Sequence, residues 1–167
     1  MRAVVFFVNS SAKESITVFD TTLRDGEQTP GISFKFEQKI EIASQLSEIG
    51  VHTIEAGFPA SSSGEFETVK AISALGLDSN ICGLARMKKE DVDACISAGV
   101  DMVHVFIPTS DVQRTYTIKK SREEVLSITD EIVRYVRDHC DLCMFSAMDA
   151  TRTDWDYLME VLRTAAG

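Results

Sequence analysis

The sequence predicts an α/β fold with parallel strands. Short apolar, partly β-branched segments recur along the chain, amphipathic segments lie between them, and glycines follow several of the amphipathic segments. Strands that alternate regularly with helices form a parallel sheet with right-handed crossovers. The expected strands are residues 16–20, 52–57, 80–85, 101–107 and 141–147.

The strand and helix pattern fits two architectures. One is a self-contained doubly wound sheet, and the other is part of an eight-unit (β/α)₈ barrel, which typically needs about 250 residues. The pattern alone does not choose between them. In both architectures the functional side chains gather at the carboxyl ends of the strands, so the strand ends are the places to look for a site.

The first expected helix covers residues 34–49, and Gly50 follows it where a left-handed C-terminal cap is needed. Gly76 and Gly99 have the same place after the next two helices. The apolar residues of the first helix recur at helical spacing and are expected to face the core: Phe36, Ile40, Ala43, Leu46 and Ile49.

Two later helices are expected to begin at capping patterns. Ser121 with Glu124, and Thr153 with Asp156, match the hydroxyl residue followed three positions later by an acid that starts many helices. These pairs place the fourth and fifth helices after the strands at 101–107 and 141–147.

Composition excludes some classes of partner. The chain has 17 Lys plus Arg and 26 Asp plus Glu, a net charge of −9, so it should repel nucleic acid and anionic membranes. A small anionic substrate stays possible, because a metal ion or one buried arginine reverses the field locally. The four cysteines are expected to be reduced thiols of a cytoplasmic protein.

Residues 1–15 are expected to form a poorly ordered leader, and residues 16–167 a single domain. The apolar run at residues 4–8 is shorter than the core of a signal peptide and far shorter than a membrane span.

Reactive side chains are dense after the first strand. Residues 20–31 read DTTLRDGEQTPG, and Asp25 and Arg24 follow the strand directly. A plain βα loop, in which Asp20 or Asp25 binds backbone N–H groups, explains this on composition as well as a site does. As a site, the carboxylate binds a divalent cation and the guanidinium stabilises an oxyanion.

Other strand ends carry further candidates. Glu55 lies among apolar residues and needs a partner, either Arg24 or a ligand. His104 is a lone strand histidine, more often a core residue than a ligand. Arg86 is as well explained by an exposed loop, and Asp149 with Arg152 by a local ion pair.

Five segments together resemble a known enzyme family: DTTLRDGEQ (20–28), IEAGFP (54–59), GLAR (83–86), VHVFIPTSD (103–111) and FSAMDATRTD (145–154). In order and spacing they are similar to the 2-isopropylmalate, homocitrate and citramalate synthases, and more distantly to hydroxymethylglutaryl-CoA lyase. The resemblance covers roughly residues 16–167. It implies the N-terminal part, about five of eight units, of a catalytic TIM barrel.

The resemblance also implies an activity. Enzymes of this family condense acetyl-CoA with a 2-oxo acid on a divalent metal (Mg, Mn or Zn), in amino-acid biosynthesis such as that of leucine. By resemblance, Asp25 binds the metal and Arg24 is catalytic. The substrate-binding residues implied are Gln28, Glu55, His104 and Ser146. A cytoplasmic homodimer is implied for the full-length protein.

Two departures from the family pattern bear on activity. Met148 stands where the family usually has glutamate, and a thioether cannot transfer a proton. The family's His-x-His metal motif does not occur in the 167 residues. We therefore expect the chain to be a fragment that is inactive alone, with open sheet edges that promote association. The alternatives are a non-catalytic or split-barrel subunit that needs a partner chain, and a carbon-carbon lyase.

Overall fold

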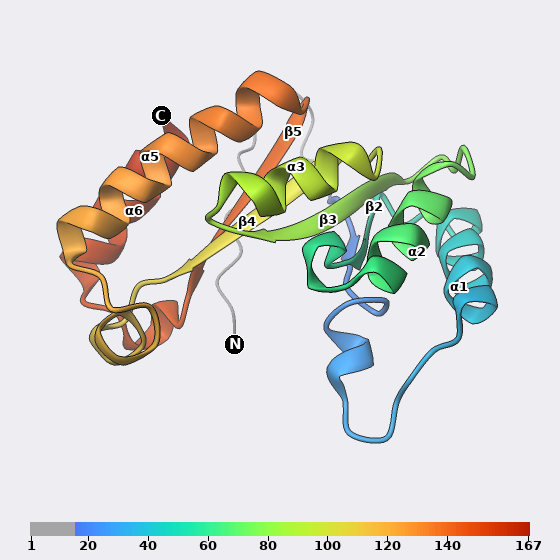
Figure 1. Cartoon of the computed structure of the whole chain (residues 1–167), viewed down its shortest axis with the longest axis horizontal. Coiled ribbons are helices and arrows are strands. Elements are labelled where there is room, and N and C mark those ends of the chain that lie inside the picture. Colours follow the sequence, from blue (N-terminus) through green and yellow to red (C-terminus); the bar gives the residue numbers. More distant parts are fainter. Residues whose placement is uncertain (1–15) are drawn as a thin grey trace.

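The computed structural model describes residues 16–167, and these contain one sheet of five parallel strands (Figure 1). The strands are β1 (Phe19–Asp20), β2 (Thr53–Gly57), β3 (Asn80–Arg86), β4 (Met102–Pro108) and β5 (Leu142–Met148). They lie in the order β1-β2-β3-β4-β5, and every neighbouring pair is parallel. The leader predicted at 1–15 lies outside the described residues.

Helices connect the strands. The longer ones are α1 (Phe36–Glu48), α2 (Ser63–Ser73), α3 (Lys89–Ser97), α5 (Arg122–His139) and α6 (Trp155–Ala166). Short helical turns are η1 (Gly26–Gln28), η2 (Pro59–Ser61), α4 (Asp111–Gln113), η3 (Arg114–Ile118) and η4 (Ala150–Arg152). No helix within residues 16–167 is long and apolar enough to cross a membrane.

The arrangement decides between the two predicted architectures. Strand order follows chain order throughout, and the longer helices contact one another in the sequence α1, α2, α3, α5, α6, which puts them on one face of the sheet. A doubly wound sheet reverses its strand order and carries helices on both faces. The described residues therefore form a half-barrel, which confirms the prediction of about five of eight units.

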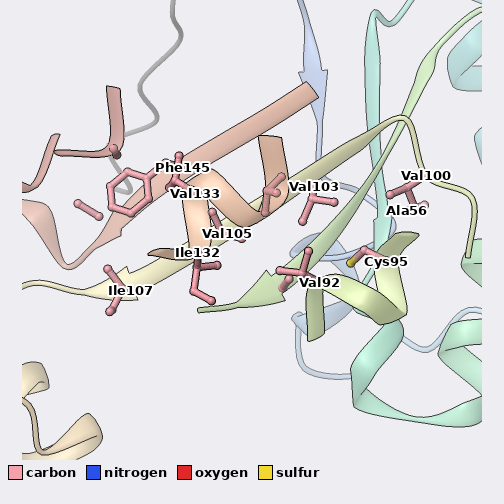
Figure 2. Close-up of a cluster of buried hydrophobic side chains, with 14 of the residues drawn as sticks. Ala56, Val92, Cys95, Val100, Val103, Val105, Ile107, Ile132, Val133 and Phe145 are labelled. Atoms are coloured by element: carbon pink, nitrogen blue, oxygen red, sulfur yellow. The ribbon is translucent and has the colours of Figure 1, made fainter. Parts of the chain in front are cut away.

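The hydrophobic core lies between the sheet and this helical layer. Along β4, Val103, Val105 and Ile107 are buried in the core cluster, whereas the alternate residue His104 is not part of it. Figure 2 shows these β4 side chains among those of α3 and α5, including Val92, Cys95, Ile132 and Val133. The alternation leaves the other face of the sheet, the interior of the barrel, for polar side chains.

The predicted helix signals are confirmed at two places. Gly50 has φ +86°, and its N–H donates to the Ser47 carbonyl while the Val51 N–H donates to the Leu46 carbonyl. This is a Schellman motif, which ends α1 and needs a residue with positive φ. Ser121 and Glu124 form the expected reciprocal capping box at the start of α5. We attribute the sharp boundaries of both helices to these local signals.

The first strand and helix differ from the prediction. β1 covers only Phe19–Asp20 rather than 16–20, although the Val18 carbonyl still accepts from the Thr53 N–H. Phe36, the first residue of α1, is 46% exposed, and Ile49, the residue after its last, is 77% exposed, so the prediction that both face the core is wrong. β1 lies at an edge of the described sheet, and Phe36 and Ile49 lie at the two ends of the helix, where less of the core covers them.

The predicted cap at Thr153 is also wrong. Asp154 caps α6, because its side chain accepts from the Tyr157 N–H. The Thr153 hydroxyl lies instead 2.7 Å from the Thr109 hydroxyl, which ties the end of β5 to the end of β4. Asp and Thr are both good N-caps, so the sequence around 153–156 does not distinguish one from the other. The helical turns at 111–118 were not predicted.

Candidate functional site

A chain of four polar side chains crosses the interior of the half-barrel. Arg24 Nε donates to Glu55 Oε2 at 2.6 Å, and Arg24 Nη2 lies 2.6 Å from the same oxygen. The other carboxylate oxygen of Glu55 lies 2.5 Å from His104 Nδ1, and His104 Nε2 lies 2.7 Å from Ser146 Oγ. All four residues are buried, with Glu55 fully so.

The partners of Glu55 fix the hydrogen-bond roles of His104. An acid buried at 0% exposure against a guanidinium carries a negative charge, so Glu55 accepts bonds and has no proton to donate. His104 Nδ1 must then be the donor toward Glu55. In the neutral imidazole this leaves Nε2 to accept the Ser146 hydroxyl proton.

Strand geometry explains how these residues meet. The pairing of β2 with β3 shifts between Glu55 and Gly57, and a bulge of this kind re-aims the neighbouring side chains. Glu55 is opposite Cys82, where burial and then the Glu55 charge raise the pKa of the thiol well above its ordinary value. His104 also packs edge-on against the Phe19 ring, with centroids 6.1 Å apart, which further restricts the imidazole.

The loop after β1 holds Arg24 and Asp25 at the end of the strand. Asp20 Oδ1 accepts from the Thr22 N–H, as the plain loop interpretation predicted for this acid. The Thr21 carbonyl then accepts from the N–H groups of both Arg24 and Gly26. This tight turn places Asp25 beside Arg24, whose Nη1 donates to Asp25 Oδ1 at 2.7 Å. The loop is therefore an ordered platform.

A cavity of about 240 Å³ opens at this end of the strands. It is lined by Arg24, Gln28, Phe58, Leu84, His104, Phe106, Ser146, Ala147 and Met148. Its polar groups are the side chains of Arg24 and Gln28 from the loop after β1, the His104 imidazole and the Ser146 hydroxyl. The remaining lining is apolar. A pocket of this size and character suits a small organic acid with an aliphatic part.

Most of the predicted site residues gather at this cavity. Arg24, Gln28, His104 and Ser146 line it, and Glu55 lies behind Arg24 and His104 as their common partner. Asp25 does not line the cavity but contacts Arg24 at its edge. The roles assigned to these residues stay predictions, because geometry alone does not test them.

Sequence reasoning missed the apolar part of the lining. Leu84 and Phe106 lie at the carboxyl ends of β3 and β4, and Phe106 and Met148 each follow an inward-facing polar residue two positions earlier. The signal was available, because residues i and i+2 of a strand share a face. Met148, noted earlier as a departure from the family, is thus part of the cavity wall.

Two other strand-end groups are structural. Arg86 forms a bidentate ion pair with Asp91, with N–O distances of 2.6 and 2.9 Å, and does not line the cavity. Arg152 pairs with Asp149 at 2.7 Å, as the local interpretation predicted. Asp149 also accepts a hydrogen bond from Ser110, so it joins the loops after β4 and β5.

These residues provide only part of the ligand set that a divalent metal needs. Asp25 has a side chain 46% exposed and provides hard carboxylate oxygen at the cavity edge. Residues 16–167 contain no group of three or more His, Cys, Asp or Glu side chains that could hold a metal ion. The chemistry of Asp25 fits one ligand position of a Mg²⁺, Mn²⁺ or Zn²⁺ site.

Comparisons with known proteins identify relatives of the chain. A family model described as HMGL-like matches residues 15–167. The chain is 60% identical over 158 residues to a Methanosarcina mazei protein named "Probable 2-isopropylmalate synthase", covering 95% of the chain and 31% of the relative. It is 52% identical over 157 residues to the 2-isopropylmalate synthase of Methanocaldococcus jannaschii, covering 94% and 30%. The chain therefore spans about a third of the length of these curated relatives.

Solved structures share the fold. The hydroxymethylglutaryl-CoA lyase of Pseudomonas aeruginosa matches with a TM-score of 0.70 at 20% identity, covering 90% of this chain and 55% of that protein. The HMG-CoA lyase of Bacillus subtilis matches with a TM-score of 0.63 at 21% identity, covering 75% and 44%. At this identity the likeness establishes the half-barrel fold alone.

Proposed function

Because the chain belongs to the HMGL-like family, we propose that it forms the N-terminal part of the catalytic barrel of an acyltransferase that condenses acetyl-CoA with a 2-oxo acid. Relatives named 2-isopropylmalate synthase support this reaction over the lyase reaction of other family members. The 2-oxo acid that yields 2-isopropylmalate on condensation with an acetyl unit is 3-methyl-2-oxobutanoate. Its carboxylate and its branched aliphatic end match a cavity that is polar on one side and apolar on the other.

The observation that carries the proposal is the buried connection from Arg24 through Glu55 to His104 and Ser146 at the cavity. In the proposed reaction the methyl carbon of acetyl-CoA loses a proton and forms a bond to the carbonyl carbon of the 2-oxo acid, whose oxygen becomes an alkoxide and is then protonated. Water hydrolyses the thioester of this adduct, which gives the 2-hydroxy diacid and free CoA thiol. Arg24 stabilises the negative charge of the alkoxide, and Glu55 holds the guanidinium in place at no cost in reorganisation.

The remaining residues bind and orient the substrate. Gln28 donates from its side-chain amide to the carboxylate of the 2-oxo acid, and the hydrogen-bonded pair of His104 and Ser146 forms the polar wall of the cavity beside that carboxylate. Phe58, Leu84 and Phe106 exclude water around the aliphatic end, which strengthens the polar contacts. A divalent cation held in part by Asp25 supplies Lewis-acid polarisation of the carbonyl when bound. The base that removes the methyl proton is not assigned to a residue of this chain.

The isolated chain should not turn over, because one carboxylate cannot define a metal geometry. The test is therefore a chimera in which this chain replaces the matching segment of the Methanocaldococcus jannaschii enzyme. We expect the chimera to release CoA thiol from acetyl-CoA only when a 2-oxo acid is present, and the isolated chain to release none.

Controls separate chemistry from folding. Asp25→Asn and Arg24→Lys, which keeps the charge beside Glu55, should each strongly lower thiol release in the chimera while leaving the circular dichroism spectrum unchanged. A folded chimera that releases no thiol with any 2-oxo acid contradicts the proposed function. Thiol release by the isolated chain contradicts the claim that it lacks part of the site.

A further inference from the structure

A buried lysine, Lys39, does not belong to the four connected side chains of the candidate site. Lys39 of α1 is 5% exposed, and its Nζ lies 2.6 Å from Glu27 Oε2 and 2.9 Å from Glu65 Oε2. Burial by itself lowers the pKa of this ammonium, but the hydrogen bonds and charges of the two acids outweigh burial, and the pKa lies above its ordinary value. Lys39 is therefore a charged group shared between two carboxylates.

Each of the two carboxylates uses its second oxygen to hold a backbone N–H. Glu27 Oε1 accepts from the Phe34 N–H at 3.0 Å, which closes the loop between β1 and α1. Glu65 Oε1 accepts from the Phe58 N–H at 3.3 Å, just after β2. Glu27 lies one residue before Gln28, and Phe58 is a wall of the cavity. Lys39 thus joins two loops that carry site residues.

The space around Gly57 is shaped for this contact. A Cβ atom at Gly57 would lie 2.1 Å from Glu65 Oε1 and 3.0 Å from Val69 Cγ2. Only a residue without a side chain lets the carboxylate approach the backbone here. The Glu65 contact is therefore accommodated by the backbone of β2 and is not a loose surface interaction.

The two acids that bind Lys39 also border a second cavity, of about 220 Å³. Its lining is Arg24, Glu27, Gln28, Phe58, Ser61, Glu65 and Leu84. Four of these residues, Arg24, Gln28, Phe58 and Leu84, line the first cavity as well. A shift of the loop at 24–28 would consequently change both cavities together.

We infer that Lys39 is a positioning residue, which holds the loop carrying Arg24, Asp25 and Gln28 in its working place through Glu27. Without the ammonium, Glu27 and Glu65 become neighbouring like charges that share no counterion and repel each other. Glu27 would then release Phe34 and carry Gln28 with it. The effect on the loop is independent of the proposed function, whereas the effect on turnover rests on it.

Amide hydrogen exchange of this chain tests the effect on the loop. The N–H groups of Arg24, Gly26, Gln28 and Thr29 are donors to loop carbonyls, and those of Phe34 and Phe58 bind the two acids directly. We expect Lys39→Met to speed exchange at these amides at least about tenfold while β4 amides keep their rates. Lys39→Arg should restore most of the protection, because it keeps the charge.

Lys89→Met is the matched control. Lys89 is the first residue of α3 and pairs with an acid, Glu131 of α5, at 2.7 Å, but its side chain is 48% exposed and its ion pair does not involve Glu27 or Glu65. The control should leave the loop amides unchanged. Equal exchange in the two methionine variants would overturn the inference, as would uniform acceleration across the chain, which would make Lys39 a residue of general stability.

Turnover of the chimera gives the second readout. Lys39→Met should lower kcat at least about tenfold and leave KM within a few-fold, since the loop presents a group that acts in the transition state. Lys89→Met should match the unsubstituted chimera. If the unsubstituted chimera is inactive, the proposed function has failed and the exchange experiment alone decides on Lys39. An active chimera whose kcat is unaffected by Lys39→Met overturns the catalytic part of the inference.

Discussion

Glu55 of β2 reaches across the intervening strand β3 to His104 of β4, with 2.5 Å between Oε1 and Nδ1. The contact joins two strands that share no backbone hydrogen bonds. It passes over the inner face of the sheet, where β3 presents the small Cys82 and leaves room. Because Arg24 binds the same carboxylate, three elements far apart in sequence depend on one buried charge.

Glu55→Gln should destabilise the fold substantially. The substitution leaves the Arg24 guanidinium buried without its counter-charge, and breaking a buried pair in this way typically costs about 3 to 5 kcal/mol. Urea unfolding followed by circular dichroism measures the change. Glu131→Gln, which breaks the exposed pair with Lys89, is the control and should leave stability close to that of the unsubstituted chain. Equal effects of the two variants would show that Glu55 is not the anchor of the interior.

The neutral form of His104 should be the Nδ1–H tautomer, because Glu55 accepts at Nδ1 and Ser146 can donate at Nε2. The ¹⁵N shifts of the imidazole distinguish the two tautomers directly. A strongly downfield Nδ1 proton is expected from the short bond to the carboxylate. This proton signal should disappear in Glu55→Gln and persist in Ser146→Ala. The opposite tautomer would reverse the hydrogen-bond roles assigned to the site.

Sequence reasoning predicted the strands and the order of the units, and most of the residues that it named as site candidates line the cavity or contact its lining. It anticipated the pairing of Glu55 with Arg24, because a buried acid at a strand end needs a partner. It could not place His104 beside Glu55 from position alone, since a strand's sequence carries no information about distances across an intervening strand. The family resemblance singled out His104, and the geometry now supplies its neighbours.

The burial of Lys39 could not be predicted from the apolar periodicity of its helix. In the helix at 34–49 a charged residue is assigned to the solvent face, yet Lys39 is buried while Phe36 is exposed. The apolar pattern assumes that the whole helix lies over a core. α1 lies at the edge of the described sheet and packs against α2, which carries Glu65, and against the loop that carries Glu27, so its buried face is partly ionic. Tertiary context of this kind overrides periodicity.

The cysteines should differ strongly in reactivity. Burial raises the pKa of Cys95 to about 12 and that of Cys143 to about 11, and it raises the pKa of Cys82 as well. Thiolate is the nucleophile, so at about pH 8 iodoacetamide should modify the partly exposed Cys140 first and leave Cys82 and Cys95 intact. Peptide mass spectrometry identifies the modified positions. In denaturant all four should react, and rapid labelling of Cys82 in the folded chain would contradict its burial.

Acid stability should depend on Asp149. Hydrogen bonds from Arg152 and then from Ser110 hold the pKa of this carboxyl below its ordinary value. A depressed pKa contributes stability that is present above the unfolded value of about 3.9 and is lost as pH falls through the folded value. Asp149→Asn removes the titration but tolerates the left-handed backbone, where φ is 64°. Stability of the variant, measured from about pH 5 to pH 2, should therefore fall less steeply. Parallel curves for the two proteins would contradict this linkage.

The rate of the chimera should rise when Met148 is replaced by glutamate. Met148 lines the cavity beside Ser146 and Ala147, and its thioether can neither accept nor donate a proton in the reaction. A carboxylate there could take part in proton transfer, which typically contributes about 10²-fold or more to a rate. We expect Met148→Glu to raise kcat for CoA release at least about tenfold. Met148→Gln is the matched control, because it has similar length and polarity but no titratable proton. If both variants speed the reaction equally, the gain comes from polarity of the cavity wall. If neither does, turnover in this barrel does not use a proton-transfer group at the end of β5.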